Sequence, residues 1–301
     1  QFRWPGFPFE PFTPETVCRW YACRDAQTGM PAWVPEEMIF LNPLAGHRHR
    51  LCAGVTTGLA AGPHEFHVLL RGLQEVIERD SVVGAWWNRY PIEEWPADAV
   101  FARLGHSVAQ RLQRPNLRYR FYRVRTPFSD HVTFVRLDGD DREGFCFSIG
   151  SACRETRIES WRKALLEAVQ GRHYVRYLQT QPDPVRLPVD FAEHAVYYSR
   201  HPDLLRRTVL DRPEPVADNR NGEVEPLTAL MCRLGPDRPV LFRNLTPPAI
   251  AQEFPGWRVL RVIVPGMQPL HGHHMMPHLG GPLWSPRAAD DWRTMLPHPF
   301  P

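Results

Sequence analysis

The segment Gly58-Leu-Ala-Ala-Gly62 is followed by a helix-forming stretch that carries Glu75 and Glu78, and Gly150-Ser-Ala-Cys-Arg154 is followed by one that carries Glu167 and Gln170. Gly150 lies 92 residues after Gly58, as Glu167 does after Glu75 and Gln170 after Glu78. A constant offset across glycines and acidic residues indicates duplication. We therefore expect one unit, a glycine-rich turn leading into a helix, to occur twice.

Both stretches have the periodicity of amphipathic helices. At about 100° per residue their apolar residues fall on one stripe, which predicts a buried face. The polar pairs, Glu75 with Glu78 and Glu167 with Gln170, stand at i,i+3 away from that stripe, where two groups can meet one ligand. The stripe consists of Phe66, Leu69, Leu70, Leu73, Val76 and Ile77 in the first helix and of Ile158, Trp161, Leu165, Ala168 and Val169 in the second.

The plain alternative for each polar pair is a solvated face, on which Glu75 forms ion pairs with Arg71 and Arg79 at i,i+4. For one helix alone this alternative is the stronger one. Surface charges have little reason to recur in register with a glycine-rich turn and an apolar stripe, however. The repetition therefore favours ligands that two units contribute to one central site.

Three segments resemble the YcaO domain family. Residues 57–62 with 72–80 resemble its GLAAG…GLLEVIERD signature, residues 160–170 resemble its S-x6-E-x2-Q segment, and Pro297-His-Pro-Phe-Pro301 fits the PxPxP tail of azoline-forming members. The resemblance implies a Mg²⁺-requiring enzyme that uses ATP to activate backbone amides of a ribosomally made precursor peptide, so that Cys, Ser or Thr side chains close into thiazolines or oxazolines. YcaO-type thioamide or amidine formation, and a non-catalytic ATP- or peptide-binding scaffold subunit, remain the alternatives.

The resemblance also implies site residues. Nucleotide contacts are expected at Glu75, Glu78, Arg79, Ser160, Glu167, Gln170 and Arg261, with Glu75, Glu78 and Glu167 as metal ligands. Pro297, Pro299 and Pro301 are expected to enter the catalytic site, where the carboxylate of a chain ending at Pro301 would orient groups or accept a proton. A floppy tail is the alternative, since the chain contains 32 prolines.

Elementary chemistry agrees with a nucleotide site of this kind. Mg²⁺ prefers oxygen ligands and is commonly held by a few carboxylates together with substrate phosphates. An arginine such as Arg79 presents a bidentate fork to phosphate oxygens. No GxxxxGK[ST] motif is present, and the sole lysine, Lys163, stands in no such context, which argues against a Walker-type ATPase.

We expect residues 1–301 to form a YcaO-like catalytic domain that lacks the N-terminal part of the family. The family's GKG-type loop and first S-x3-E-x2-E-R helix are not found before the matched region, which places them upstream or in another polypeptide. No leader-peptide-binding module is evident. The expected partners are therefore a precursor peptide, a leader-peptide-binding protein and a dehydrogenase in the same complex, with oligomerisation.

The amino-acid composition limits the classes of protein to which the chain can belong. The chain is 43% hydrophobic, which suffices for a full core. It has neither a run of about 18 apolar residues nor a signal-peptide pattern at Gln1, so a cytoplasmic protein without a membrane partner is expected. The six cysteines form no CxxC pair, which argues for reduced thiols rather than a zinc site. The net charge of +3 is too small to indicate nucleic acid.

Two segments invite a more specific interpretation. Residues 118–125 alternate arginines with aromatic or apolar residues, as in single-strand nucleic-acid binders, but a strand with one basic face explains them better. The four histidines of residues 271–278 have the residue type of a zinc or nickel site. They lie in a Pro- and Gly-rich loop without a carboxylate or cysteine to complete the set, so a metal there is the weaker interpretation.

The remaining pattern predicts an α/β (α+β) protein of repeated strand–helix units around a central ATP and Mg²⁺ site. Antiparallel pairing is expected among the closely spaced strands of residues 117–137. Trp86 and Trp87 are expected in the core. Strands are expected at 117–124, 132–137, 145–149, 240–244 and 259–264, a helix at 226–233, loops at 179–190 and 211–222, and mostly turns and extended chain in residues 1–50.

Overall fold

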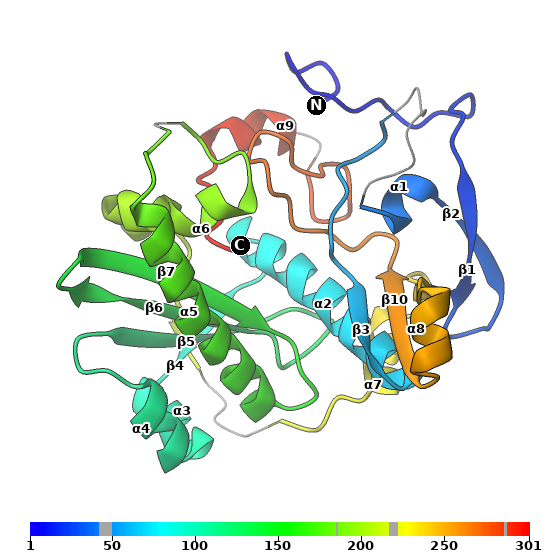
Figure 1. Cartoon of the computed structure of the whole chain (residues 1–301). Coiled ribbons are helices and arrows are strands. Elements are labelled where there is room, and N and C mark those ends of the chain that lie inside the picture. The colour runs from blue at the N-terminus through cyan, green and yellow to red at the C-terminus, as the bar shows by residue number, and fades with distance from the viewer. Residues whose placement is uncertain (42–49, 185, 217–221, 286–287) are drawn as a thin grey trace. The chain divides into compact units, whose positions relative to one another are not determined.

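A computed structural model describes residues 1–41, 50–184, 186–216, 222–285 and 288–301. The chain divides into two compact units (Figure 1). Unit 1 comprises residues 1–80, 226–271 and 276–292; unit 2 comprises 81–225, 272–275 and 293–301. Helix α2 (Glu65–Trp86) begins in unit 1 and its last turns belong to unit 2. The mixed α/β class predicted from the sequence is confirmed.

Unit 1 contains a five-stranded antiparallel sheet with the order β2-β1-β9-β10-β3. Strands β9 and β10 confirm the predicted strands at 240–244 and 259–264, and α7 confirms the helix predicted at 226–233. The strands are β1 (Trp20–Asp25), β2 (Pro31–Pro35), β3 (Leu59–Pro63), β9 (Leu241–Asn244) and β10 (Trp257–Ile263), and the helices are α1 (Glu36–Ile39), α7 (Leu227–Leu234), α8 (Pro248–Glu253) and α9 (Ala288–Asp291), which is followed by the short turn η2 (Trp292–Thr294).

The first copy of the repeat is a turn at residues 57–58 that leads into a strand and then a helix. Residues 59–63 form β3 at the edge of the sheet, because they pair with β10 along their whole length. Gly58 has φ of 83°, and a Cβ there would lie 2.0 Å from the Val262 carbonyl oxygen, so only glycine fits. The predicted apolar stripe of α2 is buried except for Phe66, which is 56% exposed, because it lies in the first turns of the helix.

Unit 2 contains the second sheet, with the order β7-β6-β5-β4-β8. Its neighbours are antiparallel, as predicted for 117–137, apart from the parallel pair β4 and β8. The strands are β4 (Ile92–Trp95), β5 (Arg118–Val124), β6 (Thr133–Asp141), β7 (Gly144–Ala152) and β8 (Glu214–Pro215), and the helices are α3 (Ala97–Leu104), α4 (His106–Leu112), α5 (Arg157–Gln179), α6 (Phe191–Arg200) and η1 (Pro202–Arg207).

The second copy of the repeat is again an edge strand followed by a helix, β7 and α5. Helix α5 lies across the sheet of unit 2 (Figure 1), and the Trp161 ring packs edge-on against Trp95 at 5.3 Å. Gly150 allows this approach, because a Cβ there would lie 2.2 Å from the Ala164 carbonyl oxygen. The second glycine-rich turn predicted from the sequence is thus the end of a strand, and the glycine serves helix-to-strand contact.

Helix α6 covers the open edge of β7. The Ser199 hydroxyl accepts a hydrogen bond from the Phe147 N–H at 2.9 Å and donates one to the Phe147 carbonyl at 3.0 Å. Cys146 and Ser148, which alternate with the predicted core residues of this strand, are buried as well. Both faces of β7 are therefore covered, which hides the alternation expected of a half-exposed strand.

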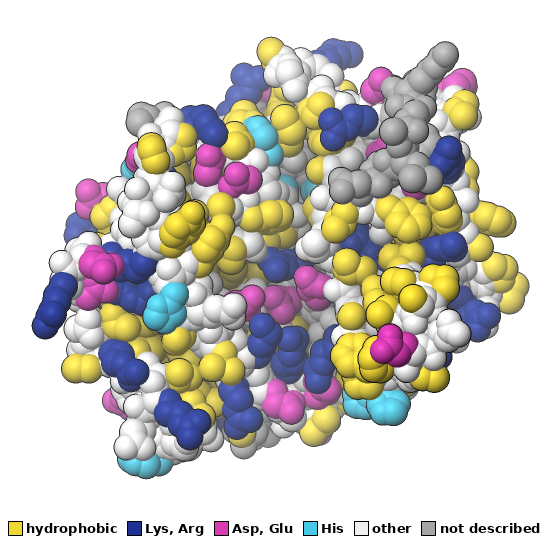
Figure 2. All heavy atoms as spheres, in the orientation of Figure 1, with side chains coloured by type: hydrophobic (Ala, Val, Ile, Leu, Met, Phe, Trp, Pro, Cys, Tyr) yellow, Lys and Arg dark blue, Asp and Glu magenta, His cyan; other side chains and the backbone are white. Residues whose placement is uncertain are grey.

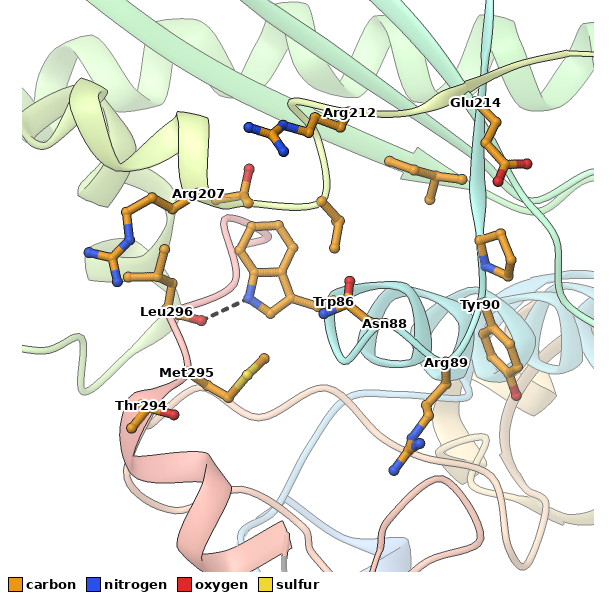
Figure 3. A pocket seen from close by; sticks show the side chains of 14 residues that line it. Trp86, Asn88, Arg89, Tyr90, Arg207, Arg212, Glu214, Thr294, Met295 and Leu296 are labelled. Atoms are coloured by element: carbon orange, nitrogen blue, oxygen red, sulfur yellow. Dashed lines mark hydrogen bonds between the residues drawn. The ribbon is translucent and has the colours of Figure 1, made fainter.

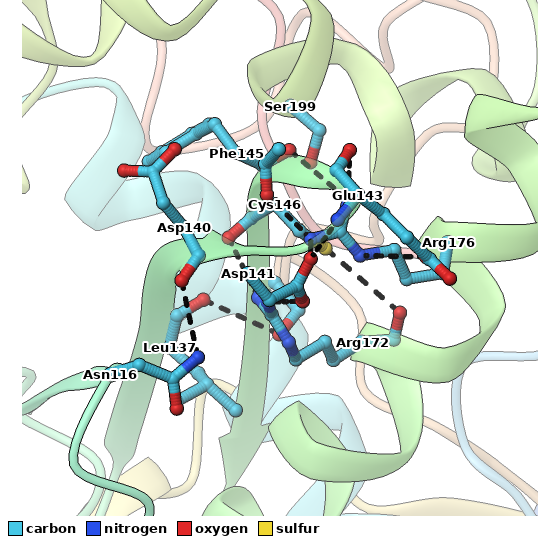
Figure 4. A network of polar contacts seen from close by, with 12 residues as sticks. Asn116, Leu137, Asp140, Asp141, Glu143, Phe145, Cys146, Arg172, Arg176 and Ser199 are labelled. Carbon is cyan, nitrogen blue, oxygen red and sulfur yellow. Dashed lines mark hydrogen bonds and ion pairs between the residues drawn. The ribbon is translucent and has the colours of Figure 1, made fainter.

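The turn of the β6–β7 hairpin is tied to the last part of α5 by a charged network (Figure 4). Asp141 accepts from Arg172 at 2.6 Å and from Arg176 at 2.5 Å, and Arg172 also donates to the Cys146 carbonyl at 2.9 Å. Arg176, followed by Arg172, holds the pKa of Asp141 at about 2, below its ordinary value. The hairpin and the helix are thereby fixed to each other within unit 2.

Within the predicted irregular segment of residues 1–50, the described residues 1–41 are more regular than expected. They contain β1, β2 and α1, with the register Trp20 to Pro35 through Arg24 to Pro31. Prolines at both ends of β2 are tolerated because β2 is an edge strand with a single neighbour. Trp86 and Trp87 are buried, as predicted.

Candidate functional site

In unit 1 the predicted site residues lie along one side of α2. The Glu75 carboxylate accepts a hydrogen bond from the Gly58 N–H at 3.2 Å, and Arg79 Nε lies 4.0 Å from its other oxygen. Burial raises the pKa of Glu75; Arg79 opposes this effect and the neighbouring Glu78 adds to it. Glu78 is only 6% exposed, so the solvated-face alternative is wrong for this residue. Two such carboxylates side by side need positive charge near them.

Arg261, on β10, is one source of that charge. It is buried, its charge acts on Glu75, and burial lowers the pKa of its guanidinium. Its Nε donates to the Met38 carbonyl at 3.0 Å and one terminal nitrogen donates to the Val55 carbonyl at 2.7 Å. Arg261 therefore fixes two chain segments of unit 1. A direct phosphate contact, predicted by resemblance, stays a prediction and would fall to its remaining terminal nitrogen.

A cavity of about 490 Å³ opens in unit 1 beside Arg261. Its walls are mainly apolar and include Val76 of α2, while Thr57, Gln268 and His278 supply polar groups. Burial lowers the pKa of His278 to about 4, so its imidazole is neutral near pH 7. The cavity shows that the side of unit 1 that carries Arg261 is hollow rather than packed.

In unit 2 the predicted residues lie on α5. The Glu167 carboxylate accepts a hydrogen bond from the Ser151 N–H at 3.2 Å, and Gln170, one turn later, is exposed. Ser160 is buried, and its Oγ accepts from the Arg154 N–H at 2.9 Å. This hydrogen bond fixes the connection between β7 and α5. A nucleotide contact by Ser160 stays a prediction, and the burial of Ser160 does not support it.

The two copies hold their central glutamate in the same way. In each, a main-chain N–H at an edge strand donates to the carboxylate of the following helix at 3.2 Å, from Gly58 to Glu75 and from Ser151 to Glu167. The donor shifts by one residue between the copies. The duplication seen in the sequence is therefore a duplication of a carboxylate held by a main-chain N–H at a strand end.

The tail is ordered and packed in unit 2. Pro297 and Pro299 are buried, as are the residues between and after them, while Pro301 is exposed. The Phe300 ring lies 4.8 Å from that of Phe134 on β6. The floppy-tail alternative is thus wrong, although entry of the tail into a catalytic site remains a prediction.

The donor chemistry of both units suits a Mg²⁺–nucleotide. Among the described residues no group of three or more His, Cys, Asp or Glu side chains could hold a metal ion by itself. Mg²⁺ bound with a nucleotide needs only one or two carboxylates, since phosphates and water complete its shell. Glu75 and Glu78 in unit 1, and Glu167 in unit 2, are of the residue type required. That they hold a metal ion, and that Arg79 contacts phosphate, stays a prediction.

The basic strand is neutralised within unit 2. Each arginine of 118–125 faces an acid on a neighbouring strand or loop; Arg118 lies 2.6 Å from Asp138, and Arg120 lies 2.6 Å from Glu94. Figure 2 shows basic side chains scattered among acidic and apolar ones on the face drawn. The prediction of a strand is confirmed, and the arginines of this strand form ion pairs.

No helix in the described part of the chain is long and apolar enough to cross a membrane.

A second cavity, also of about 490 Å³, lies in unit 2 and was not predicted (Figure 3). Its lining comes from Trp86 at the end of α2, residues 88–92, residues 207–214 and residues 294–296. Segments this far apart in sequence leave no local pattern. Trp86, Arg207 and Leu296 belong to no sequence motif, so the sequence did not indicate this cavity.

One expectation about missing motifs needs correction. The E-x2-E-R part of the first S-x3-E-x2-E-R motif is present within α2 itself as Glu75, Glu78 and Arg79, with Arg71 at the serine position. This part of the motif therefore does not have to come from upstream or from another polypeptide. A GKG-type loop is absent from the sequence.

Comparisons with known proteins identify the family of the chain. A family model described as YcaO cyclodehydratase, ATP- and Mg²⁺-binding, matches residues 1–268. No curated protein sequence matches. The structure is similar to the heterocyclase TruD (TM-score 0.66, 18% identity, 95% of this chain and 39% of that one) and to YcaO from Methanopyrus kandleri bound with AMPPCP and Mg²⁺ (0.55, 21%, 86% and 68%).

The E. coli microcin synthetase McbBCD complex with pro-MccB17 bound is similar too (TM-score 0.62, 13% identity, 94% of this chain and 73% of that one). At these identities the likeness concerns the fold. The chain spans 39% and 36% of two of the heterocyclase chains that it matches. Since the family model covers residues 1–268, the chain belongs to the YcaO family.

Proposed function

We propose that the chain catalyses ATP-dependent cyclodehydration of Cys, Ser or Thr residues in a ribosomally made precursor peptide, giving thiazolines or oxazolines. The observation that carries this proposal is the pair of matching carboxylates, Glu75 and Glu167, each held by a main-chain N–H at a strand end. The family match supports the nucleotide and the metal. The packed Pro-rich tail supports the azoline-forming branch over thioamide or amidine formation.

In the proposed reaction a substrate thiol or hydroxyl attacks the preceding amide carbonyl. The resulting hemiorthoamide oxygen takes the γ-phosphoryl group of ATP and leaves as phosphate, so that one water is lost overall per ring and ATP becomes ADP. Bound Mg²⁺ would neutralise charge on the phosphates. Glu75, Glu78 and Glu167 would hold it, and Arg79 would orient the phosphates through its paired N–H donors.

The proposed partners follow from the same reasoning. A precursor peptide is the substrate, and a separate leader-peptide-binding protein and a dehydrogenase would act in one complex with the enzyme. The similarity to the McbBCD complex with pro-MccB17 bound supports an assembly of this type. Gln170 is exposed on α5, three residues after Glu167, and would contact the nucleotide through its amide.

The test measures peptide mass. The purified chain, with ATP, Mg²⁺, a Cys/Ser/Thr-rich precursor and its leader-binding partner, should lower the peptide mass by one water per ring and release equimolar ADP. Glu75→Gln should abolish this conversion, while Glu65→Gln, on the same helix but exposed, should retain it. A mass gain from replacement of oxygen by sulfur would indicate a thioamide-forming enzyme, and full conversion by Glu75→Gln would reject the site.

A further inference from the structure

The tail of unit 2 is fixed without forming part of a sheet. Pro297 and Pro299 have no N–H, so the segment cannot pair as an ordinary strand, and proline restricts its φ angles. It is nevertheless buried, and Phe300 is only 1% exposed. Something other than main-chain pairing must therefore set its position along its own length.

Three consecutive carbonyls of this segment each accept a hydrogen bond from a different buried side chain. Trp86 Nε1 donates to the Leu296 carbonyl at 2.8 Å (Figure 3), the Tyr198 hydroxyl donates to the Pro297 carbonyl at 2.7 Å, and His194 Nδ1 lies 2.7 Å from the His298 carbonyl. All three are short, well-formed contacts. A shift of the tail by one residue would break all of them together.

The donors form one group. His194 and Tyr198 stand at i,i+4 on α6 and therefore share a face. Tyr198 packs edge-on against the Trp86 ring at 6.0 Å, and the His194 ring stacks on that of His298 at 3.9 Å with 6° between the planes. We call Trp86, His194 and Tyr198 the tail clamp.

The state of His194 is fixed by its partner. A carbonyl only accepts, so Nδ1 must carry the hydrogen and the neutral ring must be the Nδ1–H tautomer. Burial lowers the pKa of His194 to about 3, which keeps the ring neutral at all ordinary pH values. The residue thus acts as a permanent neutral donor, a task that a glutamine amide can partly perform and a leucine cannot.

We propose that the tail clamp consists of positioning residues that fix where residues 297–301 lie in unit 2 and, through that position, set the rate of ring formation. The proposal rests on the proposed function for its catalytic part and on the contacts of unit 2 for its structural part. None of the three residues needs to touch substrate. Their effect is transmitted by the stiff segment from Leu296 to Pro301.

The experiment uses the full chain and compares Tyr198→Phe with Tyr197→Phe. Tyr197 lies next to Tyr198 on α6, is half-buried, and has no hydroxyl contact to the tail among the hydrogen bonds of the described residues, so it is the matched control. Loss of one buried hydrogen bond should raise amide exchange at His298 and Phe300 about fivefold by mass spectrometry. In the cyclisation assay kcat should fall by a similar factor or more while KM for ATP and peptide stays within about twofold.

A second pair of variants distinguishes loss of the clamp from general misfolding. His194→Leu should raise exchange of the tail and lower kcat, and His194→Gln, which restores a donor, should recover part of both. If His194 had a purely structural role, its variants would lower thermal stability, but His194→Gln would not recover tail protection and kcat relative to His194→Leu. Trp86→Phe should behave as Tyr198→Phe does.

Two results would overturn the proposal. Tail exchange equal to wild type in both Tyr198→Phe and His194→Leu would show that the clamp does not hold the tail. Raised exchange with unchanged kcat, in a protein that loses turnover when residues 297–301 are deleted, would show that the clamp does not set the rate. If the wild type converts no precursor, the proposed function fails, whereas the exchange measurement still decides whether the clamp exists.

Discussion

Replacing Gly150 by alanine tests how the second repeat is built. The new methyl carbon would lie 2.2 Å from the Ala164 carbonyl oxygen, 2.7 Å from the Ala168 nitrogen and 2.9 Å from Glu167 Cβ. Ordinary contacts begin near 3.4 Å, so α5 would have to retreat from β7 by about 1 Å. Overpacking of this kind costs roughly 1–3 kcal/mol, and we expect the upper end because two of the three atoms belong to the helix backbone and cannot rotate away.

The same helix offers a control. A Cβ at Gly171 would meet nothing closer than 3.9 Å, and Gly171 lies inside α5, so Gly171→Ala should stabilise the protein by about 0.5–1 kcal/mol. Urea unfolding followed by circular dichroism, with hydrogen exchange of α5 peptides, measures both effects. Gly150→Ala should also weaken the contact between the Ser151 N–H and Glu167. Equal stability of Gly150→Ala and wild type would refute this account of the repeat.

Three further results are expected. The pKa of Asp141 is depressed in the folded state, so its ion pairs stabilise the protein above its ordinary pKa and are lost as the pH falls toward about 2; Asp141→Asn should cost about 1 kcal/mol at pH 7 and remove that part of the acid dependence of urea midpoints. Burial, followed by Glu37, raises the pKa of Cys52 to about 11, so at pH 8 a thiolate-specific reagent should label exposed Cys232 well before Cys52, and the reverse order would contradict the burial of Cys52. Deleting residues 297–301 should lower the rate of ring formation far more than the affinity for ATP or peptide, and unaltered kinetics would remove the tail from the mechanism.

The repeat explains why part of this architecture could be predicted. Periodicity located α2 and α5, and the constant offset singled out Glu75 and Glu167, because both features are local in sequence. The turn interpretation was right for Gly58 and wrong for Gly150, which lies within β7. The close approach at both glycines comes from Val262 and Ala164, partners that only the fold supplies.

Other features depend on contacts that sequence distance hides. Phe66 fits the apolar stripe by angle, yet it is 56% exposed, because periodicity alone does not show where along a helix the packing begins. The tail clamp joins residues more than 95 positions apart, His194 to His298 and Tyr198 to Pro297. The PxPxP pattern allowed the hypothesis that the tail is packed. Neither His194 nor Tyr198 belongs to a motif, so the residues that bind the tail could not be predicted.

The central proposal is that Glu75 and Glu167 both contribute to the binding of one nucleotide. Isothermal titration of Mg²⁺–ATP into the full chain tests it most directly, with Glu75→Gln and Glu167→Gln as variants and Glu65→Gln as the control. We predict one nucleotide per chain and a loss of affinity of roughly tenfold or more in either variant, the scale of one charge-assisted contact. Two independent nucleotide sites, or wild-type affinity in either variant, would contradict the claim.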